Sequence, residues 1–345
     1  MELNREKLDA EELASCLAHY DIGKVRGIRE FARGSPRSPK VVIETSRGKF
    51  LFKRRVKGRD DLAKVAFTHR IQAHLARHDF PLPGLVATKE DGSTVLAING
   101  DIYEMFHFVA GQVYDGSVEA THQAGRVLGL YHKLLKDFSC DYPAPSGSYH
   151  NASSILQAIH RTVSSLPLNA RPPAEELNKL IDSLKVSYRQ SAEGAQKLGL
   201  DRWGEQIVHG DWHPGNMLFR SRRVAAVVDY DSARLQQRAI DLANGALQFS
   251  IIAAANDPAA WPDQVDGPRL AAFVKGYASV NEISPSERRA IPLLMCEAMI
   301  AEAILPIAAT GSFGRMEGYS FLRMIDRKVA WISSHLEELL AALSV

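Results

Sequence analysis

The sequence predicts an α+β protein of two parts, a small antiparallel β-sheet with one helix followed by a larger, mainly helical region. Short apolar runs separated by turn residues fill residues 28–109, which is typical of strands. One segment among them, Asp60–His78, has apolar residues at helical spacing. Beyond Gly111 most long segments have helical periodicity. We therefore expect a boundary between residues 109 and 110.

Two β-hairpins are predicted in the N-terminal part. The paired runs are Lys40–Thr45 with Lys49–Arg55, and Thr94–Ile98 with Ile102–Val109. Asn99-Gly100 between the second pair is a strong signal for a tight hairpin turn. Pro81 and Pro83 end the helix that lies between the two hairpins. These elements predict an antiparallel sheet with one helix packed on it.

The C-terminal part reads as a series of helices with one interruption. The predicted helices are Ser117–Asp137, Ala152–Leu166, Ala174–Leu198, Ile240–Ala255, Arg269–Val280, Ser284–Ala309 and Gly318–Leu343. Two short apolar runs, Asn216–Phe219 and Val224–Val228, flank the polar segment RSRR and predict a further hairpin. A lone hairpin is unusual in a helical region, so the residues around it are candidates for a site.

The overall composition excludes several classes of function. The chain has 345 residues, of which 46% are apolar and 24% charged, and its formal net charge is +2. This balance gives no field for binding nucleic acid or a membrane surface. Three widely spaced cysteines support neither a disulfide framework nor a zinc site. No segment reaches the ~18 uninterrupted apolar residues of a membrane span. We expect a soluble cytoplasmic protein without nucleic-acid or membrane partners.

The chemistry-bearing residues surround the predicted C-terminal hairpin. His209 and Asp211 precede it, Asn216 begins it, and Asp229 follows its second strand. Phosphoryl transfer needs an acceptor that orients the attacking hydroxyl and hard oxygen ligands that hold Mg²⁺ on the phosphates. Asp211 can do the first, and Asn216 and Asp229, returned to the same end of the hairpin, can do the second. The alternatives are a helix cap or turn residue for Asp211 and a core histidine for His209, but the combined pattern favours a phosphotransfer site.

These segments carry a family resemblance. His209–Asn216 and Val227–Asp229 resemble the catalytic and metal-binding segments of the aminoglycoside phosphotransferase/choline kinase/homoserine kinase superfamily, which shares the protein-kinase fold. The resemblance implies two lobes, residues 1–109 and 110–345. It also implies that ATP and Mg²⁺ are the cofactors, that Asp211 is the catalytic base and His209 a support of its loop, and that Asn216 and Asp229 are the metal ligands.

Further positions match the family more loosely. Asp241 in an Asp-Leu-Ala segment would brace the catalytic loop, with a helix cap as the alternative, and His132 would be a buried histidine supporting that loop. Lys53 lies on the strand where the family keeps its phosphate-binding lysine; an exposed strand cation is the alternative. Gly34 and Ser35 lie where a phosphate-covering loop belongs. Backbone groups near Glu104 and Phe106 would receive the adenine.

The match fails at the helix of the first lobe. Protein kinases pair the strand lysine with a helix glutamate, but Asp60–His78 contains no glutamate, and the expected position falls near Thr68 or His69. Asp60 and Asp61 are substitutes, although the start of the helix is distant. The residue that orients Lys53 is therefore left unassigned by the sequence.

The leading hypothesis is a phosphotransferase that uses Mg²⁺ and ATP to phosphorylate a small-molecule hydroxyl. Homoserine or another amino alcohol is the first acceptor expected, and aminoglycosides and sugars follow. Glu297 and Glu302 could bind a cationic acceptor, with solvated or capping roles as the alternative. A catalytically silent kinase-fold protein that binds nucleotide or a partner is the competing hypothesis. A protein kinase fits poorly, because the eleven residues between Asp229 and Asp241 leave no room for an activation segment.

Overall fold

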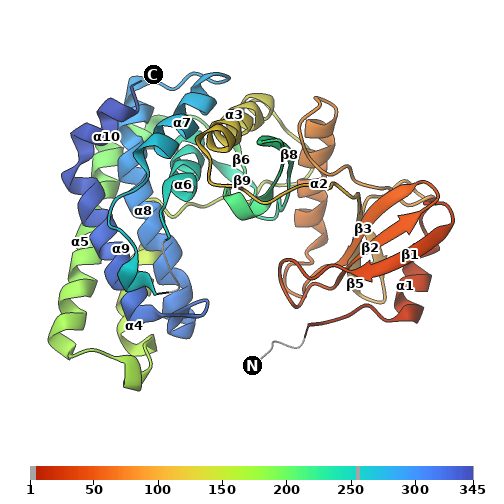
Figure 1. Cartoon of the computed structure of the whole chain (residues 1–345), viewed down its shortest axis with the longest axis horizontal. Helices are drawn as coiled ribbons and strands as arrows, with labels where there is room; N and C mark the ends of the chain where they lie inside the picture. Colours follow the sequence, from red (N-terminus) through yellow and green to blue (C-terminus); the bar gives the residue numbers. More distant parts are fainter. Residues whose placement is uncertain (1–4, 254–256, 345) are drawn as a thin grey trace.

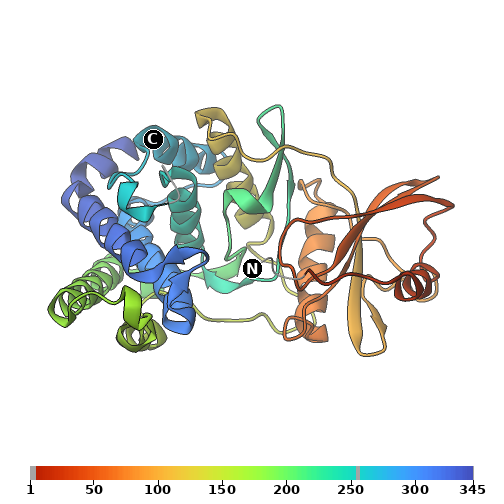
Figure 2. The ribbon, with the colours of Figure 1, turned by 60° about the horizontal axis from the view of Figure 1, so that its bottom comes forward.

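The structure is a computed structural model that describes residues 5–253 and 257–344, and it contains two hydrophobic cores. The smaller core lies between a β-sheet and helix α1 (Ala10–Leu17) and includes Phe50 and Phe52. The larger core fills the helical region and includes Trp212 and Phe273. Figures 1 and 2 show the sheet at one end of the molecule and the helices at the other. The predicted α+β class, with a small sheet region and a larger helical region, is confirmed.

The sheet has five antiparallel strands in the order β1-β2-β3-β5-β4. Their bounds are β1 Val25–Glu30, β2 Lys40–Thr45, β3 Gly48–Arg54, β4 Leu96–Ile98 and β5 Asp101–His107. Both predicted hairpins are present. Asn99 and Gly100 have φ values of 53° and 80°, the left-handed conformations that a tight hairpin turn requires.

Helix α2 (Leu62–Ala76) lies between the sheet and the helical region, as Figure 1 shows. It begins after Asp61, whose side chain accepts a hydrogen bond from the backbone N–H of Lys64 at 2.9 Å. Its buried residues Phe67 and Ile71 belong to the larger core rather than to the core of the sheet. Because α2 packs into the larger core and also contacts the sheet through His69 and Glu104, the division into 1–109 and 110–345 remains a proposal.

The helical region follows the predicted order with three differences. Its helices are α3 Val118–Leu134, α4 Ser153–Ser165, α5 Ala174–Lys197, α6 Arg238–Ser250, α7 Gly267–Ala278, α8 Pro285–Thr310, α9 Gly318–Ser334 and α10 Leu336–Ala342. The predicted last helix is therefore two helices, separated at His335. The predicted helix Ile240–Ala255 ends at Ser250, and its residues 254–255 lie outside the described residues. The predicted hairpin is β7 (Met217–Arg220) with β8 (Arg223–Val227).

The third difference is extra strands. β6 (Glu205–Val208) pairs with β9 (Arg234–Gln237), and the two-residue strands β10 (Ser312–Phe313) and β11 (Met316–Glu317) pair with each other. Each of these two strands, β6 and β9, has four residues, and five of the eight are polar or charged, so the sequence shows no strand periodicity there. The β6–β9 pair matters because the loop after β6 carries Asp211.

Helix α8 is the centre of the helical region. It packs against α4, α5, α6 and α9. Among the described residues it is the one helix long and apolar enough to cross a membrane, but 78% of its apolar window is buried inside the fold. Its apolar character is therefore explained by its position in the core.

Candidate active site

Asp211 lies in the loop between β6 and the hairpin, and Asn216 holds it. The side-chain amide nitrogen of Asn216 donates to the backbone oxygen of Asp211 at 3.0 Å and to its carboxylate Oδ2 at 2.9 Å. Because Nδ2 faces Asp211, the amide oxygen of Asn216 points to the other side, where it can meet a cation. The loop turns at Gly210, whose φ of 74° brings the backbone so close that an added Cβ would lie 2.5 Å from the Ser232 oxygen.

The hairpin brings Asn216 and Asp229 to the same end. Met217 pairs with Val227, and the backbone N–H of Val228 donates to the backbone oxygen of Asn216 at 2.9 Å. Asp229 follows directly, is exposed, and has a φ of 65°, an uncommon conformation outside glycine that often occurs at functional sites. One amide oxygen and one carboxylate suit Mg²⁺, which takes few protein ligands when substrate phosphates supply others. The described residues contain no cluster of three or more His, Cys, Asp or Glu that could hold a metal alone.

His213, for which the sequence predicted no role, modifies Asp211. Its Nδ1 accepts from the Gly215 N–H at 3.0 Å, so its Nε2 carries the proton and faces the Asp211 carboxylate at 3.6 Å. Burial acts to raise the pKa of Asp211, but His213, His209 and Asn216 together hold that pKa below its usual value. The Asp211 carboxylate in turn raises the pKa of His213. Asp211 is therefore ionised and ready to accept a proton.

Asp241 braces the loop. Its carboxylate accepts from the backbone N–H groups of His209 at 2.9 Å and Gly210 at 3.0 Å, and it contacts His132 Nε2 at 3.0 Å. It lies inside the first turn of α6, whose cap is Gln237, so the alternative of a helix cap does not apply. His132 is fully buried, as expected for a supporting histidine.

His209 stands behind the loop rather than in the site. It is fully buried, and its ring packs against Tyr131, Trp212 and Tyr230 at centroid distances of 5.8, 5.2 and 5.3 Å. Burial lowers the pKa of its imidazole, so the ring is neutral. The predicted supporting role suits this position, whereas direct contact with a substrate does not.

We expect Asp241→Asn to lower the free energy of unfolding by about 2 kcal/mol, because one of its buried hydrogen bonds becomes a clash between donors. Thermal or urea unfolding measures the change. Asp263→Asn, which alters an exposed carboxylate paired with Arg327, is the control. Equal stability of the two variants would contradict the bracing role.

A strand glutamate holds Lys53, which answers the question that the sequence left open. Glu104 on β5 is directly opposite Lys53 on β3, and their side chains form an ion pair of 2.9 Å. Glu104 is 1% exposed. Its carboxylate also contacts Arg55 at 2.8 Å and His69 at 2.7 Å, so the helix position that lacks glutamate supplies a histidine to the same carboxylate. The sequence does not show that β3 and β5 are neighbours or in which register they pair, so the contact between Lys53 and Glu104 could not be predicted from it.

Arg55 continues this network into the helical region. Its guanidinium contacts Glu104 on one side and Asp231 at 2.6 Å on the other. Asp231 is exposed but is nevertheless ion-paired. Asp231 lies two residues after Asp229. The chain of ion pairs from Lys53 through Glu104 and Arg55 therefore reaches the segment that carries the candidate metal ligand.

Glu104 and Phe106, near which adenine was predicted to bind, lie within the sheet. β5 pairs with β3 along one edge, and on the other edge Met105 O accepts from Val86 N–H at 2.9 Å while Phe106 forms a bridge with Leu85. Both residues take part in sheet pairing, and a backbone contact with adenine near Glu104 and Phe106 stays a prediction. Backbone free of these ladders begins in the connector at Val109.

The loop that carries Gly34 and Ser35 covers a second lysine. Lys40 is opposite Lys53 in the β2–β3 register, and its ammonium donates to the Arg33 oxygen at 3.3 Å. Burial, and then Lys53, lower the pKa of Lys40, while Asp229 acts to raise it. Lys40 is thus close to both Lys53 and Asp229, and the hairpin register was the signal that could have identified it.

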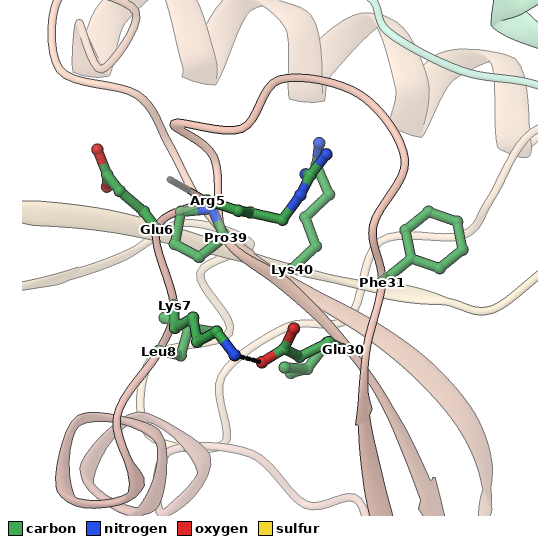
Figure 3. A pocket seen from close by; sticks show the side chains of 9 residues that line it. Arg5, Glu6, Lys7, Leu8, Glu30, Phe31, Pro39 and Lys40 are labelled. Atoms are coloured by element: carbon green, nitrogen blue, oxygen red, sulfur yellow. Dashed lines mark ion pairs between the residues drawn. The ribbon is translucent and has the colours of Figure 1, made fainter. Parts of the chain in front are cut away.

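The hollow beneath this loop is small. Figure 3 shows Arg5 and Lys40 ending beside each other there, with Lys7 paired to Glu30 at 2.7 Å. Its volume is about 30 Å³, space for about one water, so it is not a nucleotide site. Ser35 Oγ accepts from the Arg37 N–H at 3.2 Å, a bond within the loop itself. Gly34 and Ser35 remain predicted phosphate contacts.

A cavity of about 500 Å³ opens beside Asp211 in the helical region. Its lining includes Asp211, His213, Arg234 and Glu302, together with Tyr149. This volume is in the usual range for small-molecule sites. The position next to the candidate base makes it the candidate acceptor pocket.

Glu297 and Glu302 on α8 have different roles. Glu297 is fully buried and accepts hydrogen bonds from His150 Nδ1 at 2.9 Å and from the Asn151 N–H at 3.1 Å, so it joins two segments of the fold. Glu302 lines the cavity instead. Of the two, Glu302 alone can reach an acceptor in this cavity.

Comparison with known proteins gives the same assignment as the site. A profile of the phosphotransferase enzyme family matches residues 27–290, which is more than half of the chain. The homoserine kinase of Phenylobacterium zucineum (strain HLK1) is 25% identical over 297 residues, covering 82% of this chain and 80% of that protein.

Solved structures agree on the fold. The microcompartment-associated aminopropanol kinase has a TM-score of 0.69 at 14% identity, covering 96% of this chain and 98% of that one. The amicoumacin kinase hAmiN, in complex with AMP-PNP, Ca²⁺ and Ami, has a TM-score of 0.64 at 13% identity, covering 96% and 93%. The fold is thus the predicted two-lobe kinase-like fold. The chain belongs to the phosphotransferase enzyme family, and it is an enzyme that transfers a phosphoryl group to an alcohol of a small molecule.

Proposed function

We propose that the enzyme transfers the γ-phosphoryl group of ATP, with Mg²⁺, to the hydroxyl of a small amino-bearing acceptor such as homoserine or another amino alcohol. The observation that carries this proposal is the position of Asp211, between the Asn216 and Asp229 pair and the 500 Å³ cavity. A hydroxyl in the cavity meets Asp211 on one side, and phosphates held by the metal ligands lie on the other. The homoserine kinase relatives and the aminopropanol kinase fold support the acceptor class.

In this mechanism the acceptor oxygen attacks the γ-phosphorus, the bond to the ADP oxygen breaks, and the hydroxyl proton passes to Asp211. Lys53, oriented by Glu104, binds the phosphates on the side of the sheet, and Lys40 adds a second positive charge there. Asn216 and Asp229 would hold Mg²⁺, which neutralises phosphate charge as transfer proceeds. Positioning and electrostatic stabilisation are what these residues supply.

A titration of the purified protein with ATP, with and without Mg²⁺, followed by thermal unfolding, tests the nucleotide part. Binding to the folded state raises the melting temperature, and we expect the rise to require Mg²⁺. An ADP-release screen over amino alcohols, hydroxy amino acids, sugars and aminoglycosides then tests the acceptor part. No stabilisation and no ADP release would favour the alternative of a catalytically silent kinase-fold protein that acts by binding a partner.

Asp229→Ala should weaken binding of Mg·ATP by about 10-fold or more, because it removes the charged metal ligand. Affinity for ATP measured in EDTA should change little. Asp231→Asn is the control, because it keeps Asp229 but breaks the ion pair with Arg55. It shows how much affinity is lost when the loop is less firmly held while the proposed metal ligand remains. Normal Mg·ATP affinity in Asp229→Ala would exclude metal binding there.

A further inference from the structure

The acceptor cavity contains a carboxylate whose charge is not neutralised by a neighbouring cation. Glu302 Oε1 accepts from Asn244 Nδ2 at 2.9 Å, and Oε2 accepts from Gln248 Nε2 at 2.5 Å. Both donors are neutral amides on α6. Across the described residues Glu302 takes part in no ion pair within 4.0 Å, in contrast to Glu297, which is paired with His150. Two amides fix the carboxylate in place and leave its charge available to a ligand.

The same cavity contains a guanidinium, that of Arg234, whose positive charge has no carboxylate partner among the described residues. Arg234 on β9 donates through Nε to the Ser232 oxygen at 2.9 Å, and it forms no carboxylate pair among residues 5–253 and 257–344. It lies against Gly210: a Cβ placed on that glycine would be 3.0 Å from Nε and 3.2 Å from Nη2 of Arg234. Because Gly210 directly precedes Asp211, this cation stands beside the candidate base.

We propose that the pocket binds a zwitterionic hydroxy amino acid, with Glu302 binding the acceptor's ammonium group and Arg234 its carboxylate, while Asp211 takes the hydroxyl. The proposal rests on the proposed function and names the acceptor class more narrowly. Arginine is the side chain best suited to a carboxylate, because its planar fork can bind both oxygens. One fixed anion and one fixed cation match a molecule with one charge of each sign.

The same two groups discriminate against the other acceptors considered. An amino alcohol leaves Arg234 without a partner, and leaving a charged group unpaired in a partly buried site lowers affinity. An aminoglycoside brings several cations, whereas Glu302 is the one carboxylate of the lining that is neither the candidate base nor committed to bracing, as Asp241 is. A sugar offers neither charge.

The test crosses two variants with three acceptors of matched chain length. L-homoserine carries both charges, 3-amino-1-propanol lacks the carboxylate, and 4-hydroxybutyrate lacks the ammonium. Glu302→Gln should raise KM for L-homoserine and 3-amino-1-propanol by about 10-fold or more, the value of a charge-assisted hydrogen bond, and leave 4-hydroxybutyrate unchanged. Arg234→Gln should penalise L-homoserine and 4-hydroxybutyrate and leave 3-amino-1-propanol unchanged. KM for ATP should stay constant in both variants.

Several results would overturn the proposal. An equal rise in KM for all three acceptors would mean that Glu302 and Arg234 shape the pocket but do not bind the charged groups of the acceptor. A raised KM for ATP in Arg234→Gln would assign the guanidinium to phosphate instead. If the wild-type enzyme releases no ADP with any acceptor, the proposed function fails; calorimetric binding of the three compounds in the presence of Mg·ADP then decides this proposal separately, by the same crossed pattern.

The pH dependence gives an independent readout. Burial raises the pKa of Glu302 to about 7, with Asp211 adding to the rise, while Asn244, His213 and Gln248 oppose it. Glu302 therefore gains its charge as pH rises through about 7, and KM for an ammonium-bearing acceptor should fall over that range. The pKa of His213 in the same cavity is raised by Asp211, so 4-hydroxybutyrate, which does not use Glu302, is the control for its titration. Glu302→Gln should remove the step in KM; persistence of the step would exclude Glu302 as its source.

Discussion

Asp211→Asn is expected to lower kcat by about 10²–10⁴-fold, the range for loss of a general base. The asparagine preserves the shape of the side chain and can still contact Asn216, but it cannot accept the proton of the acceptor hydroxyl. The affinity for Mg·ATP should be nearly unchanged, because the proposed metal ligands Asn216 and Asp229 are left in place. Steady-state ADP release and nucleotide titration measure the two quantities on the same preparation.

Asp182→Asn is the control for this change, because Asp182 is exposed on α5, away from the cavity. Its kcat should equal that of the wild-type enzyme. Retained turnover in Asp211→Asn would exclude Asp211 as the base. His213 is the next residue to test in that event, because its Nε2 faces the same carboxylate.

Glu104→Gln is expected to lower the free energy of unfolding by about 3–5 kcal/mol and to raise KM for ATP. Breaking a buried ion pair leaves its partner charged and uncompensated, and Glu104 has two permanently charged partners, Lys53 and Arg55, besides His69. A glutamine offers these three donors one neutral oxygen. Lys53 then lacks the carboxylate that orients it, so phosphate binding weakens together with stability. Urea unfolding and the KM for ATP are the measurements.

The matched control is Glu44→Gln, which breaks an exposed ion pair on the same sheet, between Glu44 and Lys49. Exposed pairs contribute little, so stability should hardly change. Equal effects of the two variants would contradict the buried network. A stable Glu104→Gln protein with normal KM for ATP would show that Lys53 is oriented by other groups.

The effect of Glu104→Gln on stability should depend on pH. Burial acts to raise the pKa of Glu104, but Lys53, His69 and Arg55 hold it far below its usual value. A lowered folded-state pKa stabilises the protein above the unfolded-state pKa of about 4.3, and this stabilisation is lost as pH falls toward the folded value. The stability difference between wild type and Glu104→Gln should therefore be largest near neutral pH and shrink below about pH 4. A difference that grows with acid would contradict the assignment.

The network also explains how the enzyme does without a helix glutamate. In this fold the lysine-holding carboxylate comes from the strand beside Lys53, and α2 contributes His69 to that carboxylate. Arg55 extends the contact to Asp231, next to Asp229. The two regions are thus joined by charges at the point where nucleotide phosphates and metal ligands are proposed to meet.

The sequence alone determined the local elements and the residues that are close along the chain. Both hairpins of the sheet, helix α2 and most C-terminal helices follow from turn residues and apolar periodicity, which are properties of neighbouring residues. The grouping of Asp211, Asn216 and Asp229 was predictable for the same reason, because a single hairpin joins them. The short strands β6 and β9 were not, since four mixed residues carry too little periodicity.

Only the tertiary structure decided which distant charges meet. Glu104 is 51 residues from Lys53 and holds it because β5 is next to β3 in the sheet, an order that local patterns do not specify. Glu297 and Glu302 read alike in the sequence, five positions apart on one apolar helix. They differ because one side chain faces His150 in the core and the other faces the cavity beside Asp211. Sequence patterns report which residues a segment can bury; the packing of whole elements decides which of its charges find a partner and which remain available to a substrate.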